Sequence, residues 1–457
     1  MAASSGSNMF EEAMRTALER RRATGTLREL RTAEADSCFV DFGSNDYLGL
    51  ARSGELLEAS LAEAERARKE ASTTRRRRRP ASLGGHGWGK PAPPIHQAPP
   101  DAEAGPGQAC PVLGSGGSRL LSGNTGYVER LELWIAAFHN RDAALIFNSG
   151  YDANLGILSC LPQPLDTVLH DELLHNSMQM GLRLGRQRKT VPFRHNDMIH
   201  LEQLLRTAAG SVAVAEAEVE ATVAAAEPPS AAGRAKTHPG QRPKTFVAVE
   251  SVYSMDGDLA PLEEVLRLAR LYGAGVIVDE AHGTGVFGLQ GRGLVNELGL
   301  EAHPSLLATV HTFGKALGVH GAAVVGGSTL REFLVNYARP FIYSTSLPLH
   351  SLACIKCAYV MQAGEDGRRR KLWTLADTFQ SLARQGTAPP PGQASPAVHS
   401  PIQSVGVAGN DSSSRVAQGL RHRGFDVRAI RSPTVPKGTE RLRVTLHAHN
   451  SEGEVRA

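Results

Sequence analysis

One segment of the sequence places a carboxylate and an imidazole directly after an apolar run. In Gly275-Val-Ile-Val-Asp-Glu-Ala-His282, the run ends in Asp279, and His282 follows it. A carboxylate at such a position can keep a cationic ring nitrogen protonated, and the histidine could donate to an oxygen on the same ring. Each residue also has a structural interpretation, because Asp279 could cap a helix and a lone histidine is usually structural.

A second segment, His311-Thr-Phe-Gly-Lys-Ala-Leu-Gly318, holds a lysine between two glycines. Most lysines lie on solvated surfaces. A lysine in a glycine-rich loop at a strand end, however, suits a Schiff-base nucleophile, which needs a lowered pKa and room for a cofactor. Lys315 is therefore the candidate nucleophile, and Thr312 could contact a phosphate.

A third segment, Asn148-Ser-Gly-Tyr-Asp-Ala-Asn154, is expected to join a strand to a helix. Gly150 and Tyr151 would offer backbone N–H groups at the helix N-terminus, which favours a phosphate. The dinucleotide-like Gly288-Leu-Gln-Gly-Arg-Gly293 does not follow a strand directly, so a nicotinamide dehydrogenase is disfavoured. Together, a lysine, a ring-nitrogen carboxylate and a phosphate cradle predict pyridoxal 5′-phosphate (PLP).

The elements that position these residues alternate between short apolar strands and helices. Strands are expected at 144–147, 167–170, 245–250, 275–279, 306–310 and 322–325, and helices at 152–160 and 262–271. This alternation predicts an α/β fold with a mostly parallel sheet covered by helices on both faces. Ligands bind such sheets beyond the C-terminal ends of the strands, where the candidate residues fall.

Composition excludes several other classes of protein. The 457 residues carry a net charge of +4, and much of the excess lies in Arg75 to Arg79, which no aromatic platform accompanies; a nucleic-acid role therefore ranks last. Five scattered cysteines form no disulfide framework, and Cys354 and Cys357 are expected one turn apart on a helix. No long apolar stretch predicts a membrane span, and the N-terminus does not resemble a secretory signal.

Several motifs resemble the α-oxoamine synthases of the fold-type I PLP enzymes, particularly their oxononanoate synthase branch. They span residues 41 to 446 and comprise Ser44–Leu50, Gly114–Asn124, Phe147–Asn154, Ser254–Asp258, Val278–Gly285, Thr312–Lys315, Tyr343–Ser346, Ala429–Pro436 and Arg441–Leu446. The Gly-Ser-Gly-Gly-Ser-Arg-Leu and Pro-Thr-Val-Pro pieces indicate the branch.

The resemblance implies a role for each matching residue. Lys315 would carry the cofactor and move the Cα proton, and His175 would stack on the cofactor ring. The other implied contacts are Asp279 with the ring nitrogen, His282 and Ser254 with the ring oxygen, Gly150, Tyr151 and Thr312 with the phosphate, Thr345 from a second subunit, Arg443 with the amino-acid carboxylate, and Asn45 beside the bound amino acid. Arg28 matches the family's arginine for the far carboxylate of the acyl chain only loosely, and a helix-surface arginine is the favoured interpretation.

The reaction that the resemblance implies condenses L-alanine with a pimeloyl thioester, on coenzyme A or a carrier protein, and releases CO2 and 8-amino-7-oxononanoate in biotin biosynthesis. A homodimer is also implied. Two alternatives remain, a sister synthase with another amino acid or acyl chain and a non-catalytic partner subunit of the same fold. The sequence departs from the family at Ser432, where proline is common, and in stopping soon after Arg443.

The expected layout has an N-terminal segment (1–50), a large PLP-binding domain (51–339) and a small C-terminal α+β domain (340–457) that could be truncated. Residues 64–110, 211–243 and 385–398 are expected to be inserts or linkers, because they lack apolar periodicity. An intracellular, cytoplasmic location is expected, with a peroxisomal one left open if the C-terminus is incomplete.

Overall fold

The computed structural model of the chain describes residues 9–28, 30, 32, 38–76, 113–210, 242–386 and 400–457, without the side chains of 71–76 and 386. These residues form two compact units. The larger contains Leu48–Tyr253 and Leu259–Arg369, and the smaller contains Met1–Tyr47, Ser254–Asp258 and Arg370–Ala457 within the described residues. Each unit is described separately below.

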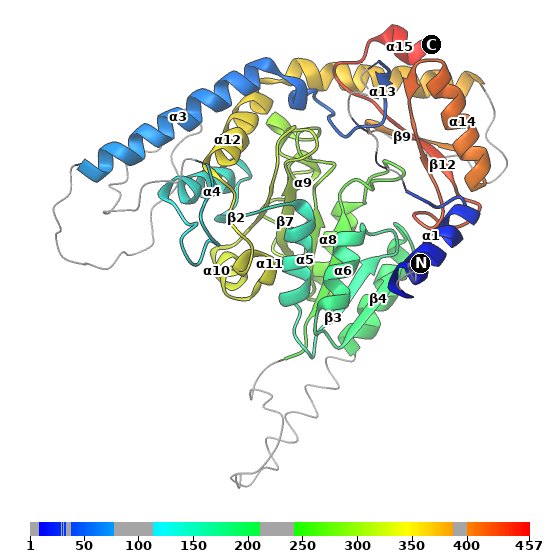
Figure 1. Cartoon of the computed structure of the whole chain (residues 1–457). Helices are drawn as coiled ribbons and strands as arrows, with labels where there is room; N and C mark the ends of the chain where they lie inside the picture. The colour runs from blue at the N-terminus through cyan, green and yellow to red at the C-terminus, as the bar shows by residue number, and fades with distance from the viewer. Residues whose placement is uncertain are drawn as a thin grey trace, which may run out of the picture. The chain divides into compact units, whose positions relative to one another are not determined.

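The larger unit is built on a seven-stranded sheet in the order β2-β8-β7-β6-β5-β3-β4. The neighbours β7, β6, β5, β3 and β4 are parallel, whereas β8 pairs antiparallel with both β7 and β2. The strands are β2 (Ala143–Phe147), β3 (Thr167–Asp171), β4 (Lys189–Phe193), β5 (Thr245–Glu250), β6 (Gly275–Asp279), β7 (Leu306–Thr312) and β8 (Ala322–Gly326). The predicted mostly parallel sheet is confirmed (Figure 1).

Helices accompany this sheet throughout the larger unit. They are α3 (Gly54–Arg76), α4 (Gly126–Phe138), α5 (Gly150–Cys160), α6 (Asn176–Leu184), α8 (Leu262–Leu271), α9 (Leu294–Glu297), α10 (Ser328–Tyr337), α11 (Arg339–Ile342) and α12 (Leu349–Gly364), with short 3-10 turns η1 (Leu50–Arg52) and η2 (Leu289–Gly291). Residues 198–210 are also helical.

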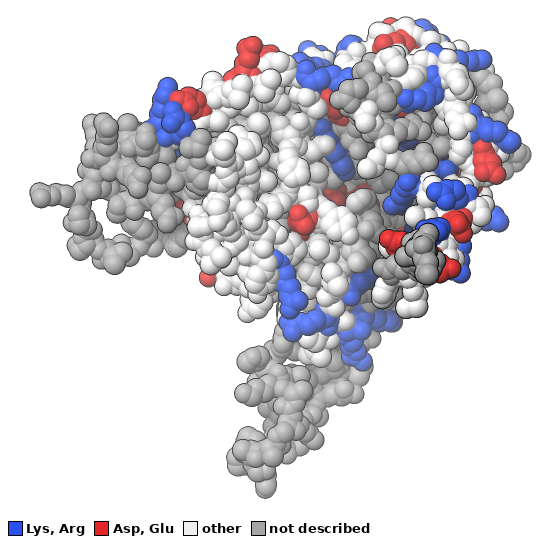
Figure 2. Space-filling model, viewed as in Figure 1, with Lys and Arg blue, Asp and Glu red and all other residues white. Residues whose placement is uncertain are grey.

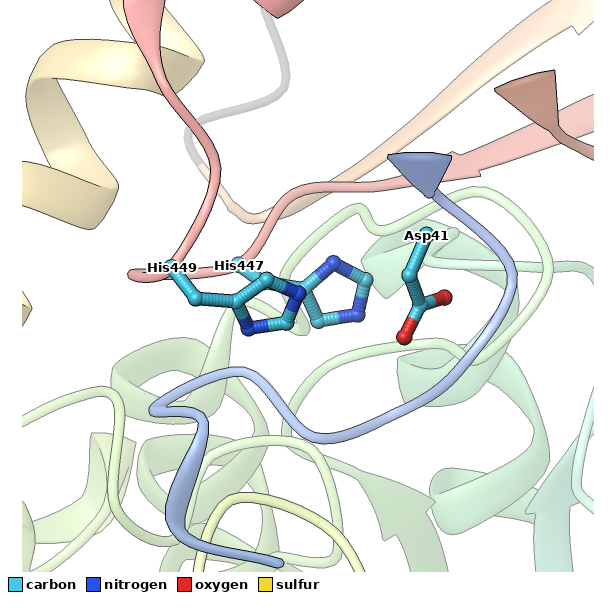
Figure 3. A group of neighbouring side chains, drawn as sticks. All are labelled: Asp41, His447 and His449. Atoms are coloured by element: carbon cyan, nitrogen blue, oxygen red, sulfur yellow. The ribbon is translucent and has the colours of Figure 1, made fainter. Parts of the chain in front are cut away.

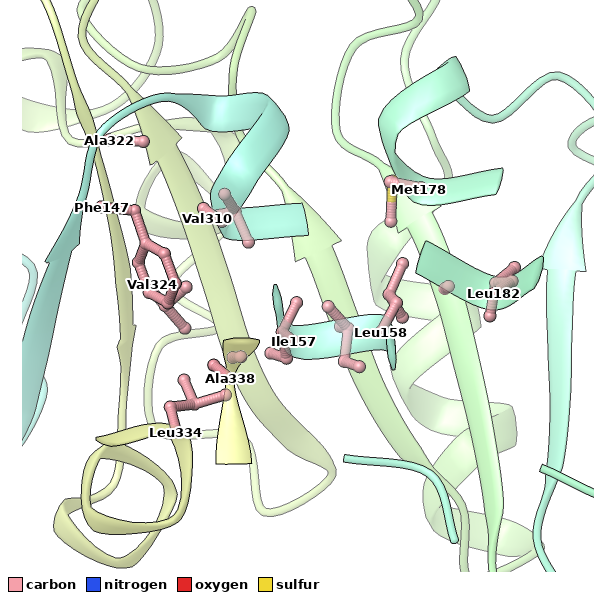
Figure 4. Packing of buried hydrophobic residues seen from close by; sticks show 14 of the residues in the cluster. Phe147, Ile157, Leu158, Met178, Leu182, Val310, Ala322, Val324, Leu334 and Ala338 are labelled. Carbon is pink, nitrogen blue, oxygen red and sulfur yellow. The ribbon is translucent and has the colours of Figure 1, made fainter. Parts of the chain in front are cut away.

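The main core lies between the sheet and helices α5, α6, α10 and α11. Ile157 and Leu158 of α5 and Met178 of α6 face Val310 and Val324 of the sheet (Figure 4). Alternate residues of these strands are buried on the opposite face, where α8 contacts β6 and α4 contacts β2. Helices therefore cover both faces, which explains why the strands read as nearly continuous apolar runs.

Most predicted elements agree with the structure within a residue or two. Three predictions need correction. The edge strand β4 was not predicted, because it contains Pro192 and most of its residues are exposed, so it lacks the apolar run of a buried strand. The predicted insert 64–110 starts too early, because its first residues form the second half of α3. The predicted linker 385–398 likewise includes the end of α13 (Asp366–Gly386). Residues 77–112, 211–241 and 387–399 lie outside the described residues.

The smaller unit is an α+β arrangement. A three-stranded antiparallel sheet has the order β11-β12-β9, and β1 pairs with β10 in parallel. Its elements are α1 (Met9–Ala23), β1 (Val40–Asp41), most of α13, β9 (Ile402–Gly406), α14 (Asn410–His422), β10 (Phe425–Asp426), β11 (Arg428–Ile430), β12 (Arg441–Thr445) and α15 (Glu452–Arg456). A capping box of Ser451 and Glu454 begins α15.

The division between the units falls within α13, at Arg369–Arg370, and not near residue 340. The reason is that α12 packs against α3 and α4, and so belongs to the larger unit. Cys354 and Cys357 both lie on α12 as free thiols, as expected.

Two surface properties bear on the excluded classes. Within the described part of the chain, no helix is long and apolar enough to cross a membrane. Figure 2 shows basic side chains in several separate groups on the viewed face, with acidic side chains among them. Arg75 and Arg76 belong to α3, and the rest of the arginine run lies outside the described residues.

Candidate active site

The candidate site of the larger unit lies at the C-terminal ends of three neighbouring parallel strands. Glu250 ends β5, Asp279 ends β6 and Thr312 ends β7. Glu250 and Asp279 are paired in register across the sheet. Strand ends at one edge of a parallel sheet are the usual place for ligands, because side chains and helix N-termini converge there.

Asp279 is buried and held in one orientation. Its side chain is 3% exposed. One carboxylate oxygen accepts a hydrogen bond from Asn154 Nδ2 at 2.7 Å, and the other accepts one from the backbone N–H of Ala281 at 2.9 Å. These two donors fix the orientation of the carboxylate. Asn154 of α5 lies in the Asn148–Asn154 segment, and the sequence indicated no role for it.

Lys315 lies in a tight loop between β7 and β8. The loop is closed by Phe313 N–H to Gly321 O at 2.9 Å and by Val319 N–H to Phe313 O at 3.1 Å. Gly318 has φ +66°, and a Cβ there would collide with the backbone of Leu50 and Ala51. The glycine is thus required for a close backbone approach, and the loop holds the half-buried Lys315 at the end of β7.

His175 is the N-cap of α6. Its Nδ1 lies 2.8 Å from Ser177 Oγ and accepts from the Ser177 backbone N–H. Desolvation lowers the pKa of His175, the positive charge of Lys315 adds to this, and Asp279 opposes it. The three candidate groups are therefore within electrostatic reach of one another, and the imidazole is neutral at neutral pH.

Glu250 belongs to the same cluster and was missed from the sequence. It is 2% exposed, and its Oε1 accepts the backbone N–H of His175 at 2.6 Å. Burial raises the pKa of Glu250 to about 8. The negative charge of Asp279 adds to this increase, and the positive charge of Lys315 opposes it. The sequence did contain a sign of its role, because Glu250 ends the apolar strand β5 just as Asp279 ends the apolar strand β6.

The predicted phosphate cradle has the expected form. Ser149 caps α5, and Gly150 and Tyr151 are its first two residues. A Cβ at residue 150 would overlap Thr312 Oγ1, so glycine is needed where the helix N-terminus meets the end of β7. The first backbone N–H groups of α5 and the Thr312 hydroxyl thus lie together, in an arrangement that fits a phosphate. The residues present therefore fit the PLP that the sequence predicted.

His282 is 5% exposed, and its loop is held by a second buried carboxylate. Glu280 accepts hydrogen bonds from Ser251 Oγ at 2.7 Å, Val295 N–H at 2.7 Å and Leu294 N–H at 3.1 Å. Burial raises the pKa of Glu280 to about 7. Glu280 therefore ties the segment after β6 to α9, and this determines where His282 lies.

Thr345 lies on the surface of the larger unit. Its backbone bridges to Ser118, and its carbonyl accepts from Asn148 Nδ2 at 2.9 Å. The Gly114–Asn124 motif and the Tyr343–Ser346 motif are therefore neighbours within one chain. The assignment of Thr345 to a second subunit's phosphate stays a prediction.

The smaller unit gathers the residues expected to contact substrate. Arg443 is 7% exposed and donates from Nε to Ser254 O at 2.7 Å, from Nη2 to Asn45 Oδ1 at 2.9 Å and from Nη1 to Thr445 Oγ1 at 3.1 Å. These three hydrogen bonds, together with a further one to Tyr47, fix the orientation of the guanidinium. Arg28 is exposed, as expected of a surface residue. It lies beyond the end of α1, however, so the prediction that it belongs to a helix is wrong.

These features define the class of protein. Residues 38–457 match the family described as aminotransferase class I and II. The serine palmitoyltransferase of Sphingomonas wittichii has the same fold, with a TM-score of 0.71, 24% identity, and coverage of 98% of this chain and 96% of that one. Other solved structures of this fold contain PLP. The fold is that of the fold-type I PLP transferases.

The curated relatives narrow the class further. The 8-amino-7-oxononanoate synthase of Emericella nidulans is 38% identical over 98% of this chain and 93% of its own length. The solved 8-amino-7-oxononanoate synthase of Francisella tularensis has a TM-score of 0.64, 22% identity, and coverage of 92% of this chain and 96% of that one. The chain belongs to the 8-amino-7-oxononanoate synthase family.

Proposed function

We propose that this chain is a PLP-dependent acyltransferase that condenses L-alanine with a pimeloyl thioester. The products are 8-amino-7-oxononanoate, CO2 and the free thiol, a step of biotin biosynthesis. The observation that carries the proposal is the cluster of Lys315, Asp279 and His175 at the sheet edge. The identity of 38% to an 8-amino-7-oxononanoate synthase along nearly the whole chain supports the choice of substrates.

The cofactor is PLP. When bound, PLP accepts the electron pair left at the amino acid's Cα and so makes that carbon a nucleophile towards the thioester carbonyl. The residues that would hold it are Lys315, the Gly150–Tyr151 backbone and Thr312 at the phosphate, His175 against the ring face, and Asp279 at the ring nitrogen. Asp279, whose two oxygens are oriented by Asn154 and Ala281, would pair with that nitrogen.

The chain's own groups would move the protons. Nζ of Lys315 would take the proton from Cα of the amino acid and return one after decarboxylation. The neutral His175 ring would pack against the cofactor without adding a second positive charge beside Lys315. His282 would donate to the ring oxygen, and its loop is held by Glu280.

The smaller unit supplies substrate recognition in this proposal. The guanidinium of Arg443 binds the alanine carboxylate as a bidentate pair. Asn45, already hydrogen-bonded to Arg443, orients that guanidinium beside the bound amino acid. Ser254 contributes through its carbonyl contact with Arg443. Arg28 remains a candidate for the far carboxylate of the acyl chain.

Assembly and compartment complete the proposal. We propose a homodimer in which Thr345 of each chain reaches the phosphate of the other. A cytoplasmic location is consistent with the free thiols of Cys38, Cys160, Cys354 and Cys357. The acyl donor is pimeloyl-CoA or a pimeloyl carrier protein.

Product formation tests the proposal. PLP-loaded protein is incubated with L-alanine and pimeloyl-CoA, beside a Lys315→Ala control, and 8-amino-7-oxononanoate is sought by mass spectrometry. We expect product with the unchanged protein only, and a preference for alanine when glycine and L-serine compete. A preference for serine or glycine would indicate a sister synthase. Absence of turnover with either acyl donor, although PLP is bound, would contradict the proposal.

A further inference from the structure

A second cluster of chemically active side chains lies in the smaller unit, apart from the residues assigned above. It consists of Asp41 at the end of β1, and His447 and His449 in the segment after β12. One ligand atom from each of the three lies within 4.8 Å of the others. Figure 3 shows His447 between His449 and Asp41.

The hydrogen bonds of His447 determine which of its ring nitrogens carries a proton. His447 is 0% exposed, and its Nδ1 lies 3.2 Å from Asn450 Oδ1. The amide of Asn450 is fixed, because its Oδ1 also accepts the His447 backbone N–H at 2.9 Å and its Nδ2 donates to Asp41 O at 3.2 Å. A proton on Nδ1 would be donated to Asn450 Oδ1 and would leave a lone pair on Nε2 of the neutral ring.

That lone pair points into a group of other acceptors. Nε2 of His447 lies 3.0 Å from Ser44 Oγ and 3.2 Å from Ser44 O. Ser44 Oγ also lies 2.8 Å from Asp41 Oδ2. Ser44 Oγ therefore bridges the imidazole of His447 and the carboxylate of Asp41.

His449 supplies a second imidazole on the same side. Its ring is stacked on that of His447, with centroids 4.7 Å apart and planes at 17°. His449 is the more exposed of the two histidines, so it provides the route by which an ion reaches the buried Nε2. Metal ligands at about 2.0–2.2 Å from a tetrahedral ion stand roughly 3.4 Å apart, a distance reached here by small side-chain rotations.

We propose that Asp41, His447 and His449 form a site for a divalent cation of the zinc type. Two imidazoles and one carboxylate are a ligand set for Zn²⁺ and neighbouring transition metals, not for Mg²⁺ or Ca²⁺. Ser44 Oγ is positioned as a further ligand. The Nδ1–H of His447 donates to Asn450, an arrangement that fixes the ring for coordination through Nε2.

The site would join two distant parts of the chain. Asp41 and Ser44 belong to the N-terminal segment, and His447 lies 403 residues after Ser44. A bound ion would hold the turn of Ser44 and Asn45, and Asn45 accepts a hydrogen bond from Arg443. The cation is therefore expected to stabilise the smaller unit and to preserve the position of Asn45, without taking part in chemistry.

The test uses full-length, tag-free protein loaded with PLP, stripped with a chelator and titrated separately with Co²⁺ and Zn²⁺. We expect one Co²⁺ per chain, with visible absorption bands that Zn²⁺ displaces. His449→Ala and Asp41→Asn should each weaken Zn²⁺ affinity by about tenfold or more. The exposed His422 of α14 gives the matched control, because His422→Ala removes a histidine of the same unit and should leave the affinity unchanged.

Circular dichroism and cofactor absorbance confirm folding of each variant, so that a lost site is not confused with a lost fold. His447→Ala should remove the cobalt bands. The proposal would be overturned if the unchanged protein bound Zn²⁺ no more tightly than His449→Ala does, or if the cobalt bands persisted in His447→Ala.

Discussion

Glu250 accepts the backbone N–H of His175 at 2.6 Å, and thereby links the end of β5 to the residue expected to cover the cofactor ring. Glu250 is also paired in backbone register with Asp279 on the neighbouring strand β6. Two buried acids at one strand edge cannot both ionise cheaply, and Glu250 is the one that keeps its proton.

Glu250→Gln tests this division of roles. The folded pKa of about 8 exceeds the ordinary value of 4.5, so native Glu250 keeps a proton that the unfolded chain loses. Its contribution is therefore favourable below pH 4.5 and is lost as the pH rises towards 8. We expect the PLP-free Gln variant to gain thermal stability relative to the unchanged protein as the pH increases through this range.

A matched pair of variants separates charge from hydrogen bonding at this position. Gln retains an acceptor for the His175 N–H, whereas Glu250→Leu leaves that buried donor unpaired at a cost of about 1–3 kcal/mol. Thermal unfolding of the PLP-free proteins across pH 5 to 9 would measure both effects. A parallel pH dependence in the Gln variant and the unchanged protein would show that Glu250 is ionised, contrary to this account.

Asp279→Asn should weaken PLP binding and slow turnover. The amide loses the negative charge, and its NH2 group would face Asn154 Nδ2, so one hydrogen bond becomes a donor–donor contact. A hydrogen bond to a charged group contributes about 1.5–3 kcal/mol, so we expect PLP affinity to fall roughly ten- to a hundredfold. Asp279→Glu restores the charge and should recover part of it. Unchanged affinity in the Asn variant would remove Asp279 from the cofactor site.

Much of the larger unit could be predicted from the sequence, because its strands are short apolar runs with clear ends. Thr245–Glu250, Leu262–Leu271 and Gly275–Asp279 were predicted with the bounds that the structure shows. The second half of α3 was not, since its solvated residues carry the helix propensity of Ala, Glu and Lys but little apolar periodicity.

The candidate site was predictable where a motif existed and not where only proximity mattered. Lys315, Asp279 and Gly150 each lie in a recognisable loop or strand end. Glu250 has no motif of its own, and its importance follows from the backbone of His175, which lies 75 residues away along the chain. Asp41 and His447 come together only through the tertiary fold.

Gly150→Ala tests the phosphate cradle. The added methyl group would overlap Thr312 Oγ1, so either the threonine or the start of α5 must move. We expect PLP affinity to fall by at least about tenfold, equivalent to about 1.4 kcal/mol. Gly327→Ala is the control, because a Cβ at that N-cap of α10 meets nothing within 4 Å. Equal PLP affinity in both variants would argue against the cradle.

Arg443→Lys should raise the KM for L-alanine more than it changes the KM for the thioester. Lysine keeps the charge but lacks the planar fork, so the bidentate pair and the contacts to Asn45 and Thr445 are lost. We expect an increase of about tenfold or more, as one charge-assisted hydrogen bond contributes about 1.5–3 kcal/mol. Steady-state kinetics with each substrate varied in turn would measure it, and an equal effect on both KM values would point to a general structural role.

The central claim is that Lys315 holds the cofactor at the end of β7, and borohydride reduction followed by peptide mass spectrometry tests it most directly. Reduction fixes PLP irreversibly on the amine that carries it. The account predicts a single pyridoxyl group, on the peptide that contains Lys315, and none in Lys315→Ala. A label on another lysine, or a Lys315→Ala protein that is labelled as well as the unchanged one, would contradict it.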